Sequence, residues 1–265
     1  MSEQPIEQLL QVMRQLRDPQ HGCPWDLQQS FTSLAPYTLE EACEVVDTLE
    51  RGDLDSLRDE LGDLLFQVVF LAQMAAEQGR FNFADVATGI SDKLVRRHPH
   101  VFGSEVQDGD INARWEALKA GERQQRGQVS VLADVPHSLP ALSRAAKLGR
   151  RAARVGFDWS DAAGARAKVF EEIAELDAAV AANDAGNMAE ELGDLLMAVS
   201  SWSRQLQLDP EACLRRSNRK LERRFAAMEQ AAAAQGLALE TLSAQAWESL
   251  WQQAKRSLPA AGDDC

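Results

Sequence analysis

Residues 171–196 read EEIAELDAAVAANDAGNMAEELGDLL, and residues 40–65 read EEACEVVDTLERGDLDSLRDELGDLL. Both stretches begin with Glu-Glu-x-x-Glu and carry Glu-Leu-Gly-Asp-Leu-Leu sixteen residues after the last of those glutamates, at an offset of 131 residues. Their apolar residues recur at mixed spacings of three and four, which is typical of amphipathic helices. A short break, at 51–53 in one stretch and 183–186 in the other, separates two helices in each. Each stretch is therefore predicted to form a helical hairpin.

The repetition extends beyond the hairpins. A basic Lys-Leu-x-Arg-Arg segment follows at 93–97 and at 220–224, and a Trp-x-x-x-Lys segment follows at 115–119 and at 251–255. The same motifs in the same order identify a tandem duplication. Between the copies, residues 121–140 contain Gly, Gln, Ser and two prolines, a composition typical of a linker. We therefore expect an N-terminal domain over 1–120, a linker over 121–140 and a C-terminal domain over 141–265.

Helical patterning also dominates the rest of the chain. Apolar residues at helical spacing cover 54–76, 163–182, 188–206 and 211–234. β-branched and aromatic residues are sparse, and there are no alternating runs joined by hairpin turns. The predicted fold class is all-α.

Composition excludes several classes of function. The chain has 265 residues with 28 Lys and Arg against 41 Asp and Glu, and a net charge of −13 disfavours extended nucleic-acid binding. The N-terminal segment is charged and amphipathic, unlike a signal peptide, and the uncharged run 64–76 is too short to span a bilayer. The four cysteines are scattered without a Cys-x-x-Cys pair, which is typical of reduced thiols in a cytoplasmic protein.

Carboxylates are the most distinctive side chains of the hairpins. Glu171, Glu172 and Glu175 share one helix face, and Glu191 and Asp194 share a face of the next helix. Apolar neighbours indicate that these acids are partly sunk between helices, where they would repel one another and lose hydration. A bound cation would relieve this, and oxygen-only ligands favour Mg²⁺ or Mn²⁺, which commonly shares phosphate oxygens. The corresponding acids of the first copy are Glu41, Glu44, Glu60 and Asp63.

One other interpretation of the acids stays open, and the glycines beside them have two explanations. The acids could form a solvated helix face, although their spaced repetition in both copies argues against it. Gly62 and Gly193 stand inside the acid-bearing helices, where glycine is about 1 kcal/mol less favourable than alanine. Their presence indicates either close helix approach or crowding by a ligand.

Basic and aromatic residues follow the acids along the chain. Lys220, Arg223 and Arg224 lie within about one helical turn and could meet a triphosphate, or form a solvated basic stripe. Lys168 precedes Glu172 by four residues and could touch phosphate or pair with that acid. Trp251 could stack on a base or pack in a core. Neither a Gly-rich P-loop nor a dinucleotide fingerprint occurs, so a nucleotide would be held by helix side chains and metal.

These motifs together resemble the MazG-type nucleoside triphosphate pyrophosphohydrolases of the all-α NTP pyrophosphatase superfamily. Residues 23–26, Cys-Pro-Trp-Asp, and the paired copies look like the two-domain bacterial form. The resemblance implies tandem helical domains that form bundles on dimerisation, and Mg²⁺-dependent hydrolysis of ATP and other NTPs or dNTPs to the monophosphate and pyrophosphate by a homodimer. It also implies that the C-terminal copy is catalytic. In the first copy Tyr37 aligns with Lys168, so that cation is missing there.

The resemblance also implies roles for individual residues. It implies metal ligation by Glu172, Glu175, Glu191 and Asp194, with Glu41, Glu44, Glu60 and Asp63 as matching ligands in the first copy. It implies a nucleotide site lined by Lys168, Glu171, Glu190, Lys220, Arg223, Arg224 and Trp251. For the mechanism we expect a metal-activated water to attack the α-phosphorus. Glu171 or Glu172 would orient or deprotonate this water. The expected catalytic residues are Glu171, Glu172 and Glu175.

The sequence leaves other functions open. A non-catalytic sensor of nucleotides or divalent metal would bind the same ligands without forming pyrophosphate. A helical interaction protein would carry the same acids on a solvated surface and would bind no metal. Base preference is not readable, since stacking on a tryptophan tolerates any base.

Overall fold

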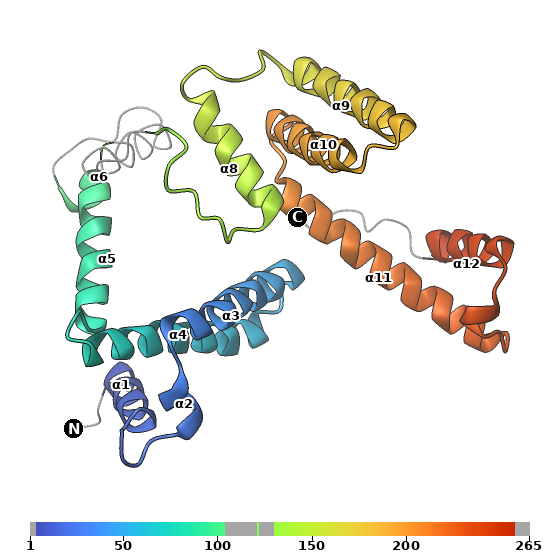
Figure 1. The fold of residues 1–265 in the computed structure, drawn as a ribbon. Coiled ribbons are helices and arrows are strands. Elements are labelled where there is room, and N and C mark those ends of the chain that lie inside the picture. Colours follow the sequence, from blue (N-terminus) through green and yellow to red (C-terminus); the bar gives the residue numbers. More distant parts are fainter. Residues whose placement is uncertain (1–3, 104–120, 122–129, 258–265) are drawn as a thin grey trace. The chain divides into compact units, whose positions relative to one another are not determined.

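The computed structural model describes residues 4–103, 121 and 130–257. Every regular element in these ranges is a helix, so the all-α prediction is confirmed for the described part of the chain (Figure 1). The chain divides into two compact units, Met1–Ala120 and Gly121–Cys265. The predicted Trp115 and Lys119 motif and Cys265 lie outside the described residues. No described helix has the length and apolar character needed to cross a membrane.

Unit 1 is built around the first predicted hairpin. Helices α3 (Phe31–Arg51) and α4 (Leu54–Glu77) pack side by side, and Gly52, with a φ of 68°, ends α3 in the left-handed conformation. Asp53 then caps α4 by accepting a hydrogen bond from the backbone N–H of Ser56. The remaining helices are α1 (Pro5–Leu16), α2 (Pro24–Gln28), α5 (Phe83–Arg97) and α6 (Pro99–Phe102). Bulky side chains from α1, α3 and α4 form its core: Met13, Leu34, Val69, Phe70 and Met74.

Unit 2 contains the second hairpin. Helices α9 (Ala162–Ala182) and α10 (Ala185–Gln205) meet at Asn183, with a φ of 55°, and Asp184 caps α10. Helix α8 (Ala141–Ala153) packs against α10. Helix α11 (Pro210–Ala234) is followed by the short η1 (Leu239–Thr241) and by α12 (Ala244–Ser257), which packs on α11. The α11–α12 contact buries Met228, Ala232, Leu250 and Ala254.

The helix boundaries reproduce the duplication. Helices α3 and α9 begin at residues 31 and 162, and α4 and α10 begin at 54 and 185, so both pairs keep the offset of 131. Helices α5 and α11 begin at 83 and 210, at the offset of 127 already visible in the basic motifs. The two copies therefore share their order of helices as well as their motifs.

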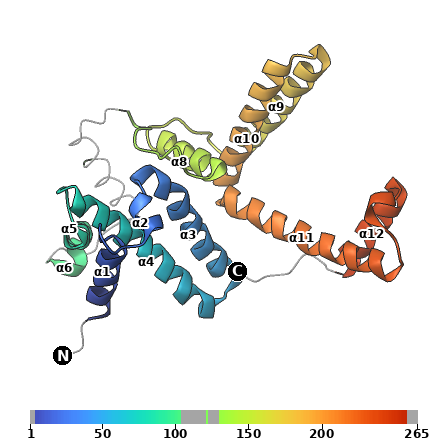
Figure 2. The same cartoon turned by 60° about the horizontal axis from the view of Figure 1, so that its bottom comes forward.

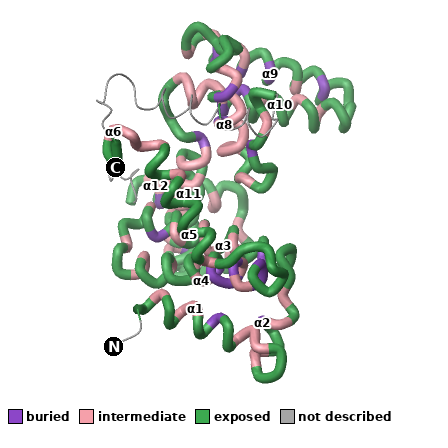
Figure 3. Tube along the Cα trace, turned by 90° about the vertical axis from the view of Figure 1, so that its left-hand side faces the viewer, coloured by how far each residue is buried: buried purple, intermediate pink, exposed green. Residues whose placement is uncertain are grey.

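Residues 130–140 lie within unit 2. Val135 is buried, and Arg151 of α8 donates a hydrogen bond to the carbonyl oxygen of Ala133. This segment is therefore joined to α8 by a buried guanidinium group. Elsewhere burial is sparse, and Figure 3 shows mainly exposed and half-buried residues along the α9–α10 hairpin.

Candidate metal and nucleotide site

The second hairpin brings three predicted carboxylates together. Oxygens of Glu172 and Glu175 on α9 and of Glu191 on α10 all lie within 4.8 Å of one another. Glu172 is only 4% exposed, whereas Glu175 is exposed and Glu191 half-buried. Asp194 is exposed one helical turn further along α10 and stands outside this group. The structure thus brings three of the four predicted ligands together, and the fourth, Asp194, lies three residues after Glu191 on α10.

The surroundings of Glu175 in this cluster raise the pKa of its carboxyl group. Desolvation is the largest cause that raises the pKa of Glu175. A hydrogen bond with Glu172 and the charges of Glu172 and Glu191 raise it further, while Lys168 acts in the opposite direction. Closely placed carboxylates that resist ionisation are stabilised by a cation, and hard oxygen donors fit Mg²⁺ or Mn²⁺. The three residues therefore fit a divalent metal ion.

Lys168 lies directly against this cluster. Its Nζ atom is 2.7 Å from Oε1 of Glu171 and 2.7 Å from Oε1 of Glu172. Hydrogen bonds to these two carboxylates raise the pKa of Lys168. Of the two roles left open for this lysine, the described contacts are those of the ion pair. Lys168 thus supplies one positive charge among the acids of the second hairpin.

The first hairpin holds an overlapping but different cluster, which includes the counterpart of Asp194 and leaves out Glu44, the counterpart of Glu175. Carboxylate oxygens of Glu41, Glu60 and Asp63 lie within 4.8 Å of one another. Desolvation, followed by the charges of Asp63 and Glu44, raises the pKa of Glu41. Tyr37, which takes the place of Lys168, presents its ring edge-on to Trp25 at a centroid distance of 5.9 Å. Both copies therefore bring three acids together, but the sets differ in one member, and no described lysine takes the place of Lys168 in the first.

The basic and aromatic residues occupy a separate part of unit 2. Lys220, Arg223 and Arg224 belong to α11, and Trp251 belongs to α12. Figures 1 and 2 both show α11 extending away from the α9–α10 hairpin with α12 at its far end. The Trp251 ring lies 5.5 Å from the guanidinium carbon of Arg224 and packs beside the α11–α12 core. Within one chain, these residues are not brought to the acids.

The structure also places Glu190 and the two glycines of the acid-bearing helices. Glu190 is exposed on α10 and does not belong to the three-carboxylate group. A Cβ atom added at Gly62 or Gly193 would meet no atom of the described chain within 4 Å. No helix of the described chain therefore approaches these glycines closely, and a helix of a second chain or a ligand stays as the explanation. Open space beside the acids remains at both positions.

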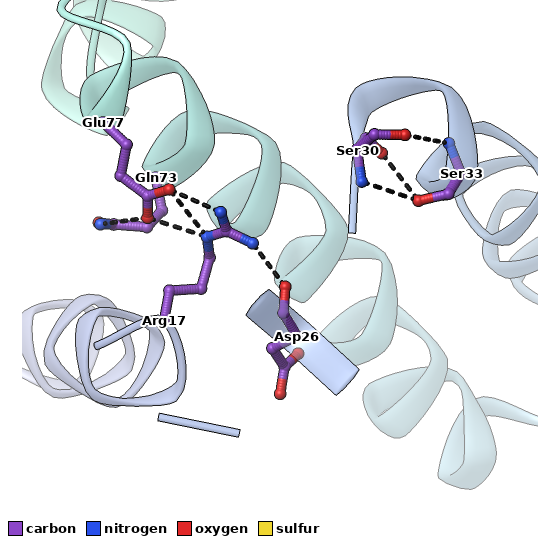
Figure 4. Close-up of polar contacts among 6 residues, drawn as sticks. All are labelled: Arg17, Asp26, Ser30, Ser33, Gln73 and Glu77. Carbon is purple, nitrogen blue, oxygen red and sulfur yellow. Dashed lines mark hydrogen bonds and ion pairs between the residues drawn. The ribbon is translucent and has the colours of Figure 1, made fainter. Parts of the chain in front are cut away.

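Each copy also carries a polar clamp that sequence reasoning missed. In unit 1, Arg17 binds Glu77 at 2.8 Å (Nε to Oε1) and 2.6 Å (Nη2 to Oε2), and donates to the Asp26 carbonyl oxygen at 2.5 Å (Figure 4). In unit 2, Arg204 of α10 binds both carboxylate oxygens of Asp158, in the segment between α8 and α9. Residues 17–25 and 151–159 share the sequence pattern Arg-x₄-Gly-x-x-Trp. This repeated pattern could have identified the two segments as corresponding parts of the two copies.

Beside the second clamp lies a pocket of about 440 Å³ between α8, α10 and residues 156–159. Its lining is mainly apolar and includes Leu148, Phe157 and Met197, with Ser201 and Arg204 as polar members. None of these residues was predicted from the sequence to belong to a site.

The fold and site define a class of protein: a tandem all-α protein whose two hairpins each present a carboxylate cluster that fits a divalent metal. The model of the MazG nucleotide pyrophosphohydrolase domain matches residues 29–102 and 162–227. The chain therefore belongs to the MazG nucleotide pyrophosphohydrolase family, which confirms the resemblance seen in the sequence.

Relatives that align over most of the chain agree with this assignment. A nucleoside triphosphate pyrophosphohydrolase of Escherichia coli (strain K12) is 51% identical over 255 residues, covering 95% of this chain and 97% of that protein. The nucleoside triphosphate pyrophosphohydrolase/pyrophosphatase MazG of Thermotoga maritima is 41% identical over 250 residues, covering 94% and 95%. A nucleoside triphosphate pyrophosphohydrolase of Mycobacterium tuberculosis is 39% identical over 153 residues, covering 57% of this chain and 46% of that protein.

Proposed function

We propose that the second hairpin catalyses Mg²⁺-dependent hydrolysis of nucleoside triphosphates, ATP among them, to the monophosphate and pyrophosphate. Family membership and the names of the relatives make the chain a nucleoside triphosphate pyrophosphohydrolase. The main support for metal-dependent hydrolysis at this hairpin is the cluster of Glu172, Glu175 and Glu191, with Lys168 in contact with Glu172. The cluster offers carboxylate ligands for a divalent metal ion beside a positively charged lysine side chain.

The metal would be held by Glu172, Glu175 and Glu191, with Asp194 one turn away as a fourth ligand. Mg²⁺ is the expected ion and Mn²⁺ a substitute, since both prefer oxygen ligands. Such an ion, when bound, neutralises phosphate charge and lowers the pKa of a bound water. The carboxylates of the chain provide the fixed charges that hold it between two helices.

Glutamates of α9 are proposed to handle the attacking water. Glu171 or Glu172 orients the water and accepts its proton as the oxygen–phosphorus bond forms at the α-phosphorus. The bond from the α-phosphorus to the oxygen that bridges to the β-phosphorus then breaks, and pyrophosphate leaves. Lys168 keeps two carboxylates in place through its contacts with Glu171 and Glu172, and lies near enough to the metal ligands to meet a substrate phosphate.

A second copy of the chain is proposed to complete the site. The phosphate-binding candidates Lys220, Arg223 and Arg224 and the substrate-binding candidate Trp251 lie away from the acids of their own chain. The α9–α10 hairpin also exposes large apolar side chains of the kind that interfaces cover. These residues include Phe170, Val180, Leu192 and Leu196. A homodimer that packs two hairpins together would cover this surface and bring the partner's α11 to the acids.

The organisation of the whole chain follows from this proposal. The N-terminal domain (1–120) would bind metal through Glu41, Glu44, Glu60 and Asp63 and support dimerisation, a linker (121–140) would follow, and the C-terminal domain (141–265) would catalyse. We place the reaction in the cytoplasm, a proposal supported by the free thiols of the three described cysteines. The acidic net charge supports a small phosphorylated substrate rather than extended nucleic acid.

Product analysis tests the proposal. The purified chain is incubated with a panel of NTPs and dNTPs and Mg²⁺, with EDTA as the control, and the products are separated. We expect monophosphate and pyrophosphate, both lost with EDTA. Diphosphate and phosphate would contradict the position of attack. Saturable Mn²⁺ binding without any product would instead support the non-catalytic sensor.

A further inference from the structure

The two hairpins differ in what holds their open ends together, the ends opposite the loops at 52–53 and 183–184. In unit 1 bulky core side chains from both helices lie there: Leu34, Val69, Phe70 and Met74. At the offset of 131 residues, the same positions of unit 2 carry small or polar side chains. They are Ala165, Ser200, Ser201 and Gln205. Apolar packing therefore contributes less to the open end of the second hairpin than to that of the first.

Polar contacts join the helix ends at the open end of the second hairpin. Arg204, near the end of α10, binds both carboxylate oxygens of Asp158, with Nη1 2.8 Å from Oδ2. The side-chain amide of Gln205 donates to Oδ1 of Asp158 at 3.0 Å and to the Trp159 carbonyl oxygen at 3.1 Å. The end of α10 is thereby fixed to the segment that leads into α9.

The segment before α9 is fixed to that helix in turn. Asp161 caps α9 by accepting a hydrogen bond from the backbone N–H of Gly164 at 2.9 Å. The Trp159 ring lies close to the first turn of α9, since a Cβ atom added at Gly164 would stand 3.3 Å from it. Helix α8 also approaches the clamp, because a Cβ atom at Gly149 would stand 3.3 Å from Nε of Arg204. Three helices therefore meet at the clamp.

The metal ligands lie between this clamp and the loop of the hairpin. Oxygens of Glu172 on α9 and of Glu191 on α10 come together across the two helices, within 4.8 Å. Each helix has 21 residues, which corresponds to about 30 Å, and the two acids lie about 10–17 Å from the loop. Opening the free end of the hairpin would therefore move the acids apart by about a third to a half as much.

Metal ligation is sensitive to displacements of this size. Mg²⁺ requires near-octahedral oxygen ligands at about 2.0–2.1 Å. Metal sites tolerate deviations of about 0.2 Å from such distances. A displacement of about 1 Å at the open end would exceed this tolerance at the acids. In the first hairpin the bulky core also holds the open end, so its acids depend less on its own clamp.

We propose that the Asp158–Arg204 clamp positions the metal ligands of the second hairpin, a proposal that rests on the function proposed above. Asp158, Arg204 and Gln205 hold the ends of α9 and α10 at the separation at which Glu172 and Glu191 share one ion. They act through the two helices and are not ligands themselves. Because coupling between two sites is reciprocal, metal binding strengthens the clamp to the same extent.

Removing the charge of the clamp tests this role. Mn²⁺ binding to the full chain with Asp158→Asn is measured by calorimetry without nucleotide, well below the melting temperature. The site of the second hairpin is the one that Glu175→Gln removes. We expect its affinity to fall about fivefold or more. We also expect kcat to fall by about the same factor, while KM for ATP at saturating Mn²⁺ changes by less than about twofold.

The clamp of unit 1 offers the matched control (Figure 4). Glu77→Gln removes the carboxylate that Arg17 binds through Nε and Nη2. This variant loses an ion pair of the same kind, but far from the second hairpin in the sequence and in the other unit. We expect it to lower the melting temperature and to leave the Mn²⁺ affinity of the second hairpin and kcat unchanged.

A second variant covers the case in which Asp158→Asn does not fold. Gln205→Ala removes two hydrogen bonds of the clamp but keeps its ion pair, and should lower Mn²⁺ affinity by about twofold or more.

A lower melting temperature with unchanged Mn²⁺ affinity and kcat would make the clamp purely structural and overturn the proposal. An equal loss of Mn²⁺ affinity in Glu77→Gln, or no Mn²⁺ site that depends on Glu175, would also overturn it. These outcomes are separate from the proposed reaction, which fails only if the unmodified chain forms no pyrophosphate from any NTP.

Discussion

At the scale of single residues, Lys168 distinguishes the two acid clusters. Both hairpins assemble three carboxylates, but only the second has a lysine within 2.7 Å of two acids. Burial and mutual repulsion disfavour ionised carboxylates, and a nearby cation offsets part of that effect. Lys168 therefore gives the second cluster a positive charge that no described residue supplies to the first.

Glu175 is the residue whose loss should reveal the metal site most clearly. Glu175→Gln removes a ligand charge but preserves the shape of the side chain, so we expect turnover to fall by about a hundredfold or more while the melting temperature is unchanged or higher. Steady-state kinetics measures the turnover, and thermal melting measures the melting temperature. Asp177→Asn, an exposed position on the same helix, is the control and should retain activity. Full activity of Glu175→Gln would refute the metal assignment.

The raised pKa of Glu175 predicts a pH dependence. Because its folded-state pKa lies above the ordinary value, the metal-free folded state binds this proton more tightly than the unfolded chain does. Its contribution to stability is therefore present at low pH and is lost as pH rises through the folded pKa. Metal binding has the opposite pH dependence and strengthens as pH rises, because the metal binds the ionised carboxylate.

Mn²⁺ affinity should accordingly fall as pH drops from neutral toward that raised pKa, and binding should release protons. Calorimetry in buffers of different ionisation enthalpy counts the protons released. The Glu175→Gln variant should release fewer than the unmodified chain. Equal proton release by both would show that Glu175 is not linked to the metal.

At the scale of elements, the hairpins were the most predictable part of the chain. Apolar spacing, the breaks at 51–53 and 183–186, and the acids at i, i+3 and i+4 depend on local sequence, and the helices follow them closely. The clamps and the pocket could not be predicted in this way. Arg204 and Asp158 are 46 residues apart, and no local pattern pairs them.

The Asp158–Arg204 clamp should contribute measurably to the stability of unit 2. Arg204 binds both oxygens of Asp158, with side chains 16% and 23% exposed, and this pairing holds the pKa of Asp158 below its usual range. We expect Asp158→Asn to lower the free energy of unfolding by about 1–2 kcal/mol in urea titrations near neutral pH. The difference should shrink as pH falls and Asp158 becomes protonated.

A surface ion pair serves as the control for the clamp. Asp59 lies 3.2 Å from Arg58, but both side chains are largely exposed. Exposed pairs contribute little, so Asp59→Asn should change stability by less than about 0.5 kcal/mol. Equal effects of the two substitutions would mean that the clamp is no stronger than an ordinary surface contact.

At the scale of the whole molecule, the tandem architecture was predictable from the sequence. The sequence also led us to expect the carboxylates of the hairpin and the basic residues of 220–224 in one site. Within one chain the two sets lie on different helices, and Figure 2 shows α11 diverging from the hairpin. Sequence order records which motifs accompany one another, but it does not record whether they meet within a chain or between chains. The exposed apolar residues of the hairpin support the proposal that a second chain covers it.

Mixing two inactive variants tests whether the site is shared. Chains with Glu175→Gln are mixed in equal amounts with chains carrying Lys220→Ala and Arg223→Ala, under conditions that exchange subunits. In a dimer with shared sites, half of the dimers are mixed and one of their two sites is intact, so activity should return to about a quarter of the unmodified level. No recovery after verified exchange would place the cations and acids in the same chain.

We propose above that the second hairpin directs water to the α-phosphorus. Hydrolysis of ATP in H₂¹⁸O with Mg²⁺, followed by mass spectrometry of both products, identifies the phosphorus atom that the water attacks. We expect ¹⁸O to enter AMP and pyrophosphate to stay unlabelled, with labelling slower by about a hundredfold or more in Glu175→Gln. Label in pyrophosphate, or release of labelled phosphate with ADP, would contradict this proposal.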